Sequence, residues 1–335
     1  MEDKLRAMRT LFFLITMLAV QTVTAQDSPL FSEFKENFKK KYFNVGLFFQ
    51  TVADYQNERT LGGNNGFSLT NIRLTISGEF DEGFGYSMQT NFINSKPILD
   101  AMIYHKFSKV IRVDAGQFKA PFSSEYLTSD PQLDFIGRSQ VTSAYSPKRQ
   151  IGFQVRGNVV EDAVSLIAGM FNGNGINTTN DDDKFMYVGR IIVTPVISEN
   201  AKLLVSGNAA YNEVTSSSFA GKKLTAGGDF KLTVNDFMFA GEFITESSEP
   251  DSGETLTNSG LQFTAGYHLS KSVQVLTRYD VLNPDDLIGE KNSLVILGCN
   301  YWPTEVTKIQ FNYIVNTDQS QLKYNQILLA GQLAF

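Results

Sequence analysis

The sequence predicts an all-β protein whose strands close into one antiparallel transmembrane β-barrel of about sixteen strands. Three observations predict this class. Apolar and polar residues alternate in segments of about ten residues, short connections alternate with long ones, and the pattern continues to the last residue. Strands of about 9–11 tilted residues are long enough to cross a bilayer. An even strand number would place both termini on the side of the short turns.

The first 25 residues are predicted to form a secretory signal peptide. The apolar run 11–20 follows Arg6 and Arg9 and precedes a stretch of small residues that ends at Ala25. An N-terminal membrane anchor is the alternative, but the run is too short to span about 30 Å of hydrocarbon as a helix. We expect cleavage before Gln26, a short periplasmic leader over 26–42 and the barrel over 43–335.

Sixteen segments carry the strand periodicity. In the second segment, for example, Ile72, Leu74 and Ile76 alternate with polar residues. The segments are expected to begin near residues 43, 67, 85, 99, 111, 150, 164, 184, 201, 222, 237, 259, 273, 293, 307 and 325.

The connections fall into two alternating classes, which is typical of bacterial outer-membrane barrels. A soluble β-sandwich is the alternative fold, but it gives no reason for this alternation. Aromatic residues such as Phe84, Phe107 and Phe335 gather near the short turns, as expected at a membrane interface. The short connections are 81–83, 108–109, 160–162, 235–236, 270–272 and 303–304; the longer ones are 55–66, 121–149, 173–183, 213–221, 246–258, 281–292 and 317–324, with a brief one at 94–98.

The last segment is predicted to close the barrel, because an open sheet edge in lipid would leave backbone amides without partners. It ends on Phe335, with apolar residues two, six and eight places earlier. This ending resembles the signal that bacterial barrel-assembly machinery reads, so we expect that machinery as a partner.

Composition and charge argue against several function classes. A net charge of −6 disfavours nucleic acid as a partner, and one cysteine excludes an intrachain disulfide framework. The chain has two histidines, and neither accompanies a nucleophile motif, so an outer-membrane hydrolase is the less favoured alternative. The acidic run 181–183 is interpreted as a solvated loop and not as a Ca²⁺ site. We expect no cofactor and no metal.

Charged residues sort toward the predicted lumen, because a lipid-facing Lys or Arg near the midplane costs about 2–4 kcal/mol. A lumen inside about sixteen strands is wide enough to hold water. Two interpretations stay open: the charges pair and stabilise the wall, or unpaired arginines line a path for anions. The lumen-facing set is Arg73, Arg112, Arg156, Arg190 and Arg278, with Glu79, Asp100, Asp114, Asp229, Glu242 and Asp280.

The connection 121–149 is much longer than its neighbours and too apolar to lie wholly in water. It contains Phe122, Leu133 and Phe135 among its apolar residues. We therefore expect it to fold into the lumen and narrow it; an ordered external flap is the alternative. Its basic residues are Arg138, Lys148 and Arg149, with Lys119 at the preceding strand end, and its acidic residues are Glu125, Asp130 and Asp134.

A family resemblance rests on motifs in this part of the chain. The stretch 116–122 (GQFKAPF), Glu125 and Arg138-Ser139 resemble the phosphate-selective porin O and P family. Asp100-Ala101, Ile151-Gly152, Phe171-Asn172-Gly173, and Gly189-Arg190 with Pro195 are similar too. The resemblance covers about 43–335 and is densest over 67–195.

The resemblance implies a trimeric, sixteen-stranded porin of a Gram-negative outer membrane, with arginines along the channel and lysines near a constriction. The long connection carries only one lysine, Lys148. We therefore expect passive diffusion of small hydrophilic solutes with a weak preference for anions such as phosphate. A structural or adhesive barrel with a plugged lumen is the alternative. The predicted pore-lining residues are Arg73, Arg112, Lys119, Arg138, Lys148, Arg149, Arg156 and Arg190.

Overall fold

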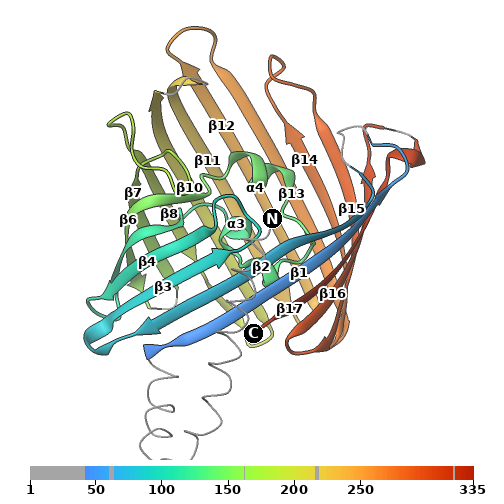
Figure 1. The fold of residues 1–335 in the computed structure, drawn as a ribbon, viewed down its shortest axis with the longest axis horizontal. Coiled ribbons are helices and arrows are strands. Elements are labelled where there is room, and N and C mark those ends of the chain that lie inside the picture. Colours follow the sequence, from blue (N-terminus) through green and yellow to red (C-terminus); the bar gives the residue numbers. More distant parts are fainter. Residues whose placement is uncertain (1–41, 60–63, 162, 216–218, 320) are drawn as a thin grey trace, which may run out of the picture.

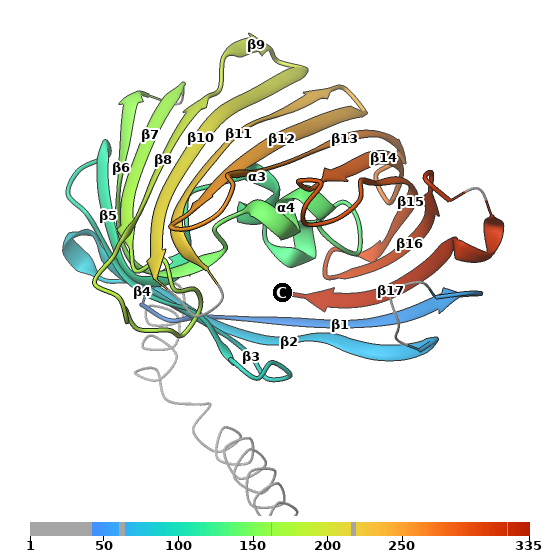
Figure 2. The ribbon, with the colours of Figure 1, turned by 90° about the horizontal axis from the view of Figure 1, so that it is seen from above.

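The computed structural model describes residues 42–59, 64–161, 163–215, 219–319 and 321–335. Within these ranges, sixteen long strands and one short strand form a single antiparallel sheet that closes on itself (Figures 1 and 2). The predicted signal peptide and all but the last residue of the predicted leader lie outside the described residues.

The long strands begin within three residues of the predicted positions. They are β1 (Asn44–Gln56), β2 (Gly66–Glu79), β3 (Phe84–Asn91), β4 (Ile98–Lys106), β5 (Ile111–Lys119), β6 (Arg149–Val160), β7 (Val164–Phe171), β8 (Met186–Val193), β10 (Ala201–Thr215), β11 (Ala220–Val234), β12 (Phe237–Pro250), β13 (Leu256–Ser270), β14 (Val273–Asn283), β15 (Asn292–Thr304), β16 (Thr307–Asn316) and β17 (Gln326–Ala334). The short strand is β9 (Val196–Ser198). The helices are η2 (Asp81–Gly83), α3 (Ser124–Leu127), η3 (Asp130–Gln132), α4 (Gln140–Tyr145) and η4 (Leu322–Tyr324).

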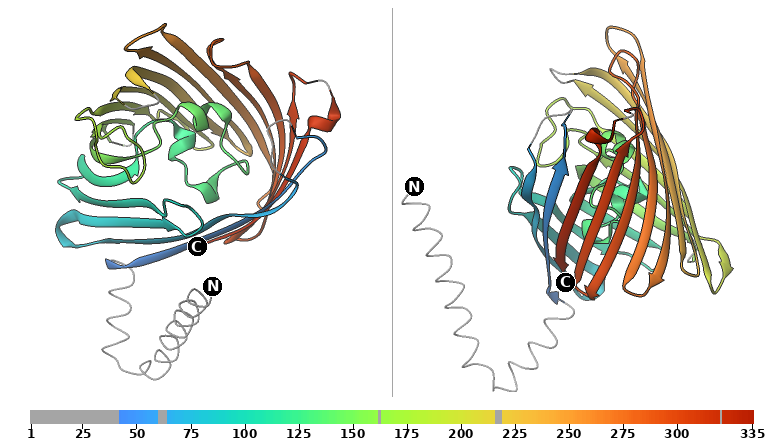
Figure 3. Two further views of the ribbon diagram at one scale, coloured as in Figure 1. Left: turned by 45° about the horizontal axis from the view of Figure 1, so that its top comes forward. Right: turned by 90° about the vertical axis from the view of Figure 1, so that its right-hand side faces the viewer.

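The first and last strands close the barrel. β1 pairs with β17 in a register that runs from Phe48 opposite Ala334 to Gln56 opposite Gln326. Beyond it, the backbones of Leu47 and Phe335 exchange two hydrogen bonds of 3.0 and 3.1 Å. Figure 3 shows the C-terminus beside the start of β1. Closure gives the backbone amides of the first and last strands partners in each other, as a barrel in lipid requires.

One strand is interrupted in a way that the alternation does not predict. Both β8 and β9 pair with β10, and Thr194 and Pro195 separate them. Proline has no backbone N–H to give to the ladder, so the pairing breaks there and resumes after it. β9 therefore continues β8 and adds no further strand to the ring.

The wall differs in height around the ring. β3, β4 and β5 have 8–9 residues, whereas β10, β11, β12 and β13 have 14–15 residues. Figure 1 shows the taller side behind the shorter strands. No helix among the described residues is long and apolar enough to cross a membrane.

The two faces of the wall are inverted relative to a water-soluble protein. Large apolar side chains such as Phe49, Val155 and Phe263 are exposed on the outside. Polar side chains such as Asn71 and Gln310 are buried on the inside. This arrangement suits a protein surrounded by lipid that encloses a polar interior.

Candidate functional site

The connection between β5 and β6, residues 120–148, is here called the inner loop. Figure 2 shows its helices α3 and α4 within the ring of strands. Each short helix begins with a serine cap: Ser123 Oγ accepts from Tyr126 N at 3.0 Å, and Ser139 Oγ accepts from Thr142 N at 3.3 Å. These caps give the loop a defined shape although its helices have only four and six residues.

Apolar side chains dock the inner loop against the wall. Phe122 and Val141 are fully buried in a cluster that includes Val188 and Ile244 of the wall. Phe135 is buried in a second cluster with Met238, Leu276 and Ile296. Fully burying a side chain of this size contributes about 1.5–3 kcal/mol, so these contacts give the loop a substantial part of its docking energy.

Two glycines of the wall make room for these side chains. A Cβ atom at Gly260 would lie 2.8 Å from Cβ of Val141, and one at Gly298 would lie 2.8 Å from the ring of Phe135. Both distances are shorter than real Cβ contacts, so the loop reaches this depth only because the wall has no side chain there. Glycine at a lumen-facing strand position was a signal that the sequence analysis did not use.

Ion pairs and hydrogen bonds hold the same side of the loop. Arg278 Nη2 lies 2.7 Å from Glu125 Oε1, and both side chains are buried. Ser124 donates from its hydroxyl to Asp229, which also pairs with Arg190 at 3.3 Å. Burial raises the pKa of Glu125, but Arg278 and the hydrogen bonds from Ser139 outweigh it and hold this pKa below its usual value. Glu125 is therefore ionised at neutral pH.

A second set of wall side chains holds the backbone of residues 131–136. Lys308 Nζ donates to Leu133 O at 2.6 Å, and Asn300 Nδ2 donates to Asp134 O at 2.9 Å. Gln332 Nε2 donates to Pro131 O at 2.9 Å. Because these donors come from β15, β16 and β17, this part of the loop is fixed independently of α3 and α4.

A cavity of about 900 Å³ lies on the other side of the inner loop. It runs between the loop and a wall made of β1–β6 and β15–β17. Its charged lining, within the described residues, consists of Arg73, Arg112, Lys119, Arg149, Arg156 and Lys308 against Asp100, Asp114, Asp130, Asp134 and Glu305. Between the loop and β11–β14, by contrast, the open volume is about 60 Å³.

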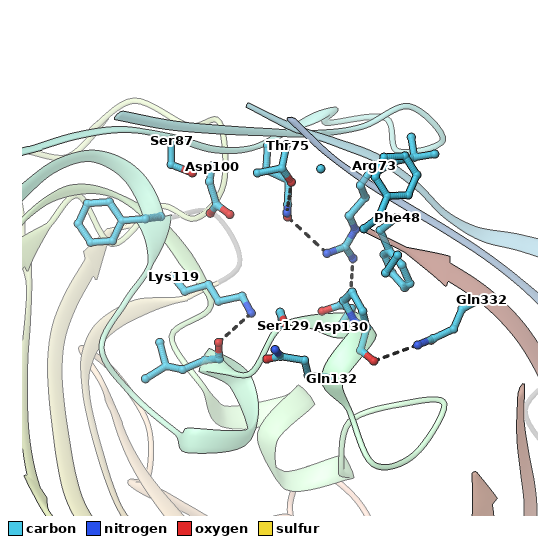
Figure 4. A pocket seen from close by; sticks show the side chains of 18 of the residues that line it. Phe48, Arg73, Thr75, Ser87, Asp100, Lys119, Ser129, Asp130, Gln132 and Gln332 are labelled. Carbon is cyan, nitrogen blue, oxygen red and sulfur yellow. Dashed lines mark hydrogen bonds and ion pairs between the residues drawn. The ribbon is translucent and has the colours of Figure 1, made fainter. Parts of the chain in front are cut away.

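The charges concentrate where the loop meets β2, β5 and β6. Arg73 forms an ion pair with Asp130 of the loop, and Asp130 also binds Arg138 at 2.7 Å. Arg149 lies 2.9 Å from Asp100. Lys119 Nζ donates to Thr128 O at 2.9 Å. Figure 4 shows Arg73 directed at Asp130, with Lys119 nearby. We call Arg73, Lys119, Arg138 and Arg149, with Asp100 and Asp130, the charged cluster; it holds four cations and two carboxylates.

Asp130 is the acidic centre of the charged cluster. Burial raises its pKa, but Arg73 and then Arg138 outweigh this effect and hold the pKa below its usual value. The carboxylate is therefore ionised at neutral pH. The ring of Tyr126 lies beneath two cations of the cluster, 5.4 Å from Lys119 Nζ and 5.2 Å from Arg138 Cζ. An aromatic face is attractive to cations, and here it stabilises two like charges that repel each other.

The structure brings five of the eight predicted pore-lining residues to the cavity: Arg73, Arg112, Lys119, Arg149 and Arg156. Arg156 is exposed and, within the described residues, has neither an ion pair nor a side-chain hydrogen bond. Across the strand pair, Arg112 is bound to Asp114 at 2.6 Å. Arg156 is thus a free cation in the cavity wall.

The other three predicted residues lie outside the cavity lining. Arg138 belongs to the charged cluster, but it is tied to Asp130 and to three backbone carbonyls of its own loop. Arg190 is buried behind α3 against Asp229. Lys148 is exposed at the end of the loop, away from the cavity lining. Alternation along a strand predicts whether a side chain points into the barrel. It does not predict whether that side chain meets the inner loop or the open cavity.

Lys308 was not among the predicted pore-lining residues, and Asp130 was predicted only as one of the acidic residues of the loop. Nothing in the local sequence marks Lys308, because the loop carbonyl that it binds is 175 residues away. Within the described residues, no group of three His, Cys, Asp or Glu is placed to hold a metal ion.

The model of the family described as phosphate-selective porin O and P matches residues 40–269. Among solved structures, an anion-selective porin from Comamonas acidovorans is similar with a TM-score of 0.67 at 14% identity, over 88% of this chain and 99% of that one. The channel DcaP of Acinetobacter baumannii gives 0.61 at 14%, over 88% and 97%.

OmpT of Vibrio cholerae, in a trimer form, gives a TM-score of 0.64 at 8% identity, over 88% of this chain and 99% of that one. No curated protein matches the sequence. At these identities the solved structures show a common fold and no more.

Proposed function

Because the chain belongs to the phosphate-selective porin O and P family and is an outer-membrane porin of a Gram-negative bacterium, we propose that it lets small hydrophilic solutes diffuse passively with a weak preference for anions such as phosphate. The cavity beside the inner loop is the proposed path, and the charged cluster is its proposed narrow part.

The observation that carries the proposal is the excess of cations in the charged cluster. Four cationic side chains surround two carboxylates, although the whole chain has a net charge of −6. Local potential governs an ion in a narrow passage with low-dielectric walls, so net charge matters less. Arg73 and Arg149 also offer paired N–H donors that suit phosphate and carboxylate oxygens.

The preference is expected to be weak because most of these cations already have partners. Asp130 binds two of the arginines, and Asp100 binds a third. Only Lys119 lacks an ion pair within the described part of the cluster. A permeating anion thus meets a modest positive potential instead of a row of free cations.

A structural or adhesive barrel with a plugged lumen is the competing function. It is supported by the contacts that the inner loop makes with β2, β14 and β16. Single-channel recording in a planar bilayer discriminates the two. Stable stepwise openings support a pore, whereas a correctly folded barrel that stays electrically silent supports the plug.

We further propose a homotrimer and delivery by barrel-assembly machinery. OmpT of Vibrio cholerae is described in a trimer form, and the exposed C-terminal Phe335 resembles the assembly signal. Analytical ultracentrifugation in mild detergent tests the first proposal, and a monomeric mass contradicts it. Deletion of Phe335 tests the second, and unchanged outer-membrane assembly contradicts it.

A further inference from the structure

Asp130 occupies a position that an incoming anion would take. Its two carboxylate oxygens are divided between two arginines: Oδ2 faces Arg73 of β2, and Oδ1 lies 2.7 Å from Nη2 of Arg138. Paired donors around two oxygens are the arrangement by which guanidinium groups bind a phosphate or carboxylate. The carboxylate of Asp130 is thus held as an anion between these two arginines.

The surroundings of Asp130 hold more positive charge than Asp130 neutralises. Among the described residues, Lys119 Nζ donates hydrogen bonds to the carbonyl oxygens of Leu127 and Thr128 and to no carboxylate, and Arg149 is bound to Asp100. An anion in this cluster would find two arginines only if Asp130 moved away from them. The side chain lines the cavity, so it is accessible from the path.

The backbone on both sides of Asp130 is fixed by hydrogen bonds. Among the described residues, the carboxylate itself bonds only to Arg73 and Arg138. Gln332 holds Pro131 O, Lys308 holds Leu133 O, and Lys119 and Arg138 both bind Thr128 O. Release of the carboxylate therefore needs a rotation of one side chain and no movement of the loop.

We propose that Asp130 is a built-in counter-anion that sets the selectivity of the passage: permeating oxyanions exchange with its carboxylate on Arg73 and Arg138. This inference rests on the proposed function and names the residue that weakens anion preference. A tethered competitor acts at a high effective concentration, so free anions bind weakly and leave quickly. Fast release favours flux over retention.

The test is Asp130→Asn, which removes the charge and keeps the shape. Asp134→Asn is the matched control, because Asp134 lines the same cavity but forms no ion pair within the described residues. We expect Asp130→Asn to raise the ratio of anion to cation permeability, from reversal potentials, by about fivefold. That factor corresponds to about 1 kcal/mol, the interaction of two unit charges about 4 Å apart in water.

A second readout is the block of chloride current by inorganic phosphate. We expect it to appear at lower phosphate concentration in Asp130→Asn than in the wild type, and Asp134→Asn to give a smaller change in both readouts. Equal changes in the two variants would overturn the proposal, since a general charge effect would explain them.

Heat-modifiable mobility in gel electrophoresis reports whether each variant has folded. Asp130→Glu is a second control, because it keeps the charge and should behave much like the wild type. If Asp130→Asn does not fold, acidification of the wild type neutralises Asp130 without a mutation. Anion preference should then rise on acidification by the same amount in the wild type and in Asp134→Asn. No rise, or a smaller rise in Asp134→Asn, would overturn the proposal. A wild type that forms no channel would refute the proposed function instead, so the two failures are distinguishable.

Discussion

The ion pair between Glu125 and Arg278 is the contact whose removal should release the inner loop most cleanly. The side chains are 9% and 4% exposed, and Arg278 makes two further hydrogen bonds, to Thr264 and to the backbone of Gly137. Glu125→Gln keeps an acceptor for Ser139 but removes the carboxylate that pairs with the buried guanidinium.

Breaking a buried pair by removing one partner costs about 3–5 kcal/mol. Because Phe122 and Phe135 still dock the loop, we expect it to remain bound but to open more often. The cost corresponds to an opening equilibrium larger by roughly one hundred- to several thousand-fold. Hydrogen exchange measured by mass spectrometry on peptides from 121–148 reports this equilibrium, and single-channel records should show added current noise.

Glu305→Gln is the control, since Glu305 is exposed at the cavity mouth and makes no side-chain bond to the loop in the described structure. The double variant Glu125→Leu with Arg278→Leu removes both charges and should restore much of the protection, because a buried pair replaced by apolar groups is often neutral in stability. Unchanged exchange in Glu125→Gln would refute the view that this pair anchors the loop.

Three further predictions concern charge, space and pH. Arg156→Glu should lower anion preference in reversal-potential measurements, whereas Lys148→Glu, away from the cavity lining, should change it little; equal effects would remove Arg156 from the path. Gly298→Leu should push the inner loop off the wall at Phe135 and toward the cavity, and so lower single-channel conductance in a barrel that still shows heat-modifiable mobility; unchanged conductance would contradict the packing argument. Because the pKa values of Glu125 and Asp130 are lowered in the folded protein, both carboxylates anchor the loop fully above the ordinary carboxyl range, near pH 4.5, and stop doing so as the pH falls through the lower folded-state values. Hydrogen exchange in the loop, corrected for intrinsic rates, should therefore rise only below about pH 4. A rise already at pH 6 would contradict this direction.

The strands could be predicted from sequence because alternation is a local property that a barrel imposes along its whole length. Every long strand begins within three residues of its expected position. The interruption at Pro195 was missed because β9 continues the same alternation after it. A proline inside a predicted strand is the signal that would have located it.

For the interior, the sequence predicted which residues face inward but not which contacts they make. Alternation gave Arg156 and Arg190 the same inward parity, yet one is free in the cavity and the other is buried behind α3. The ion pair of Arg73 with Asp130 joins residues 57 positions apart. It depends on the path of a loop whose helices are too short to show a period. Such contacts are set by packing in three dimensions and have no local sequence pattern.

We propose that this barrel is an open pore whose weak anion preference arises from the charged cluster. The measurement that tests it most directly is the reversal potential of the purified wild-type protein in a planar bilayer under a potassium chloride gradient. We predict stepwise channels with a reversal potential displaced modestly toward the chloride equilibrium potential. Displacement toward the potassium equilibrium potential, or a folded protein without channels, would contradict the account.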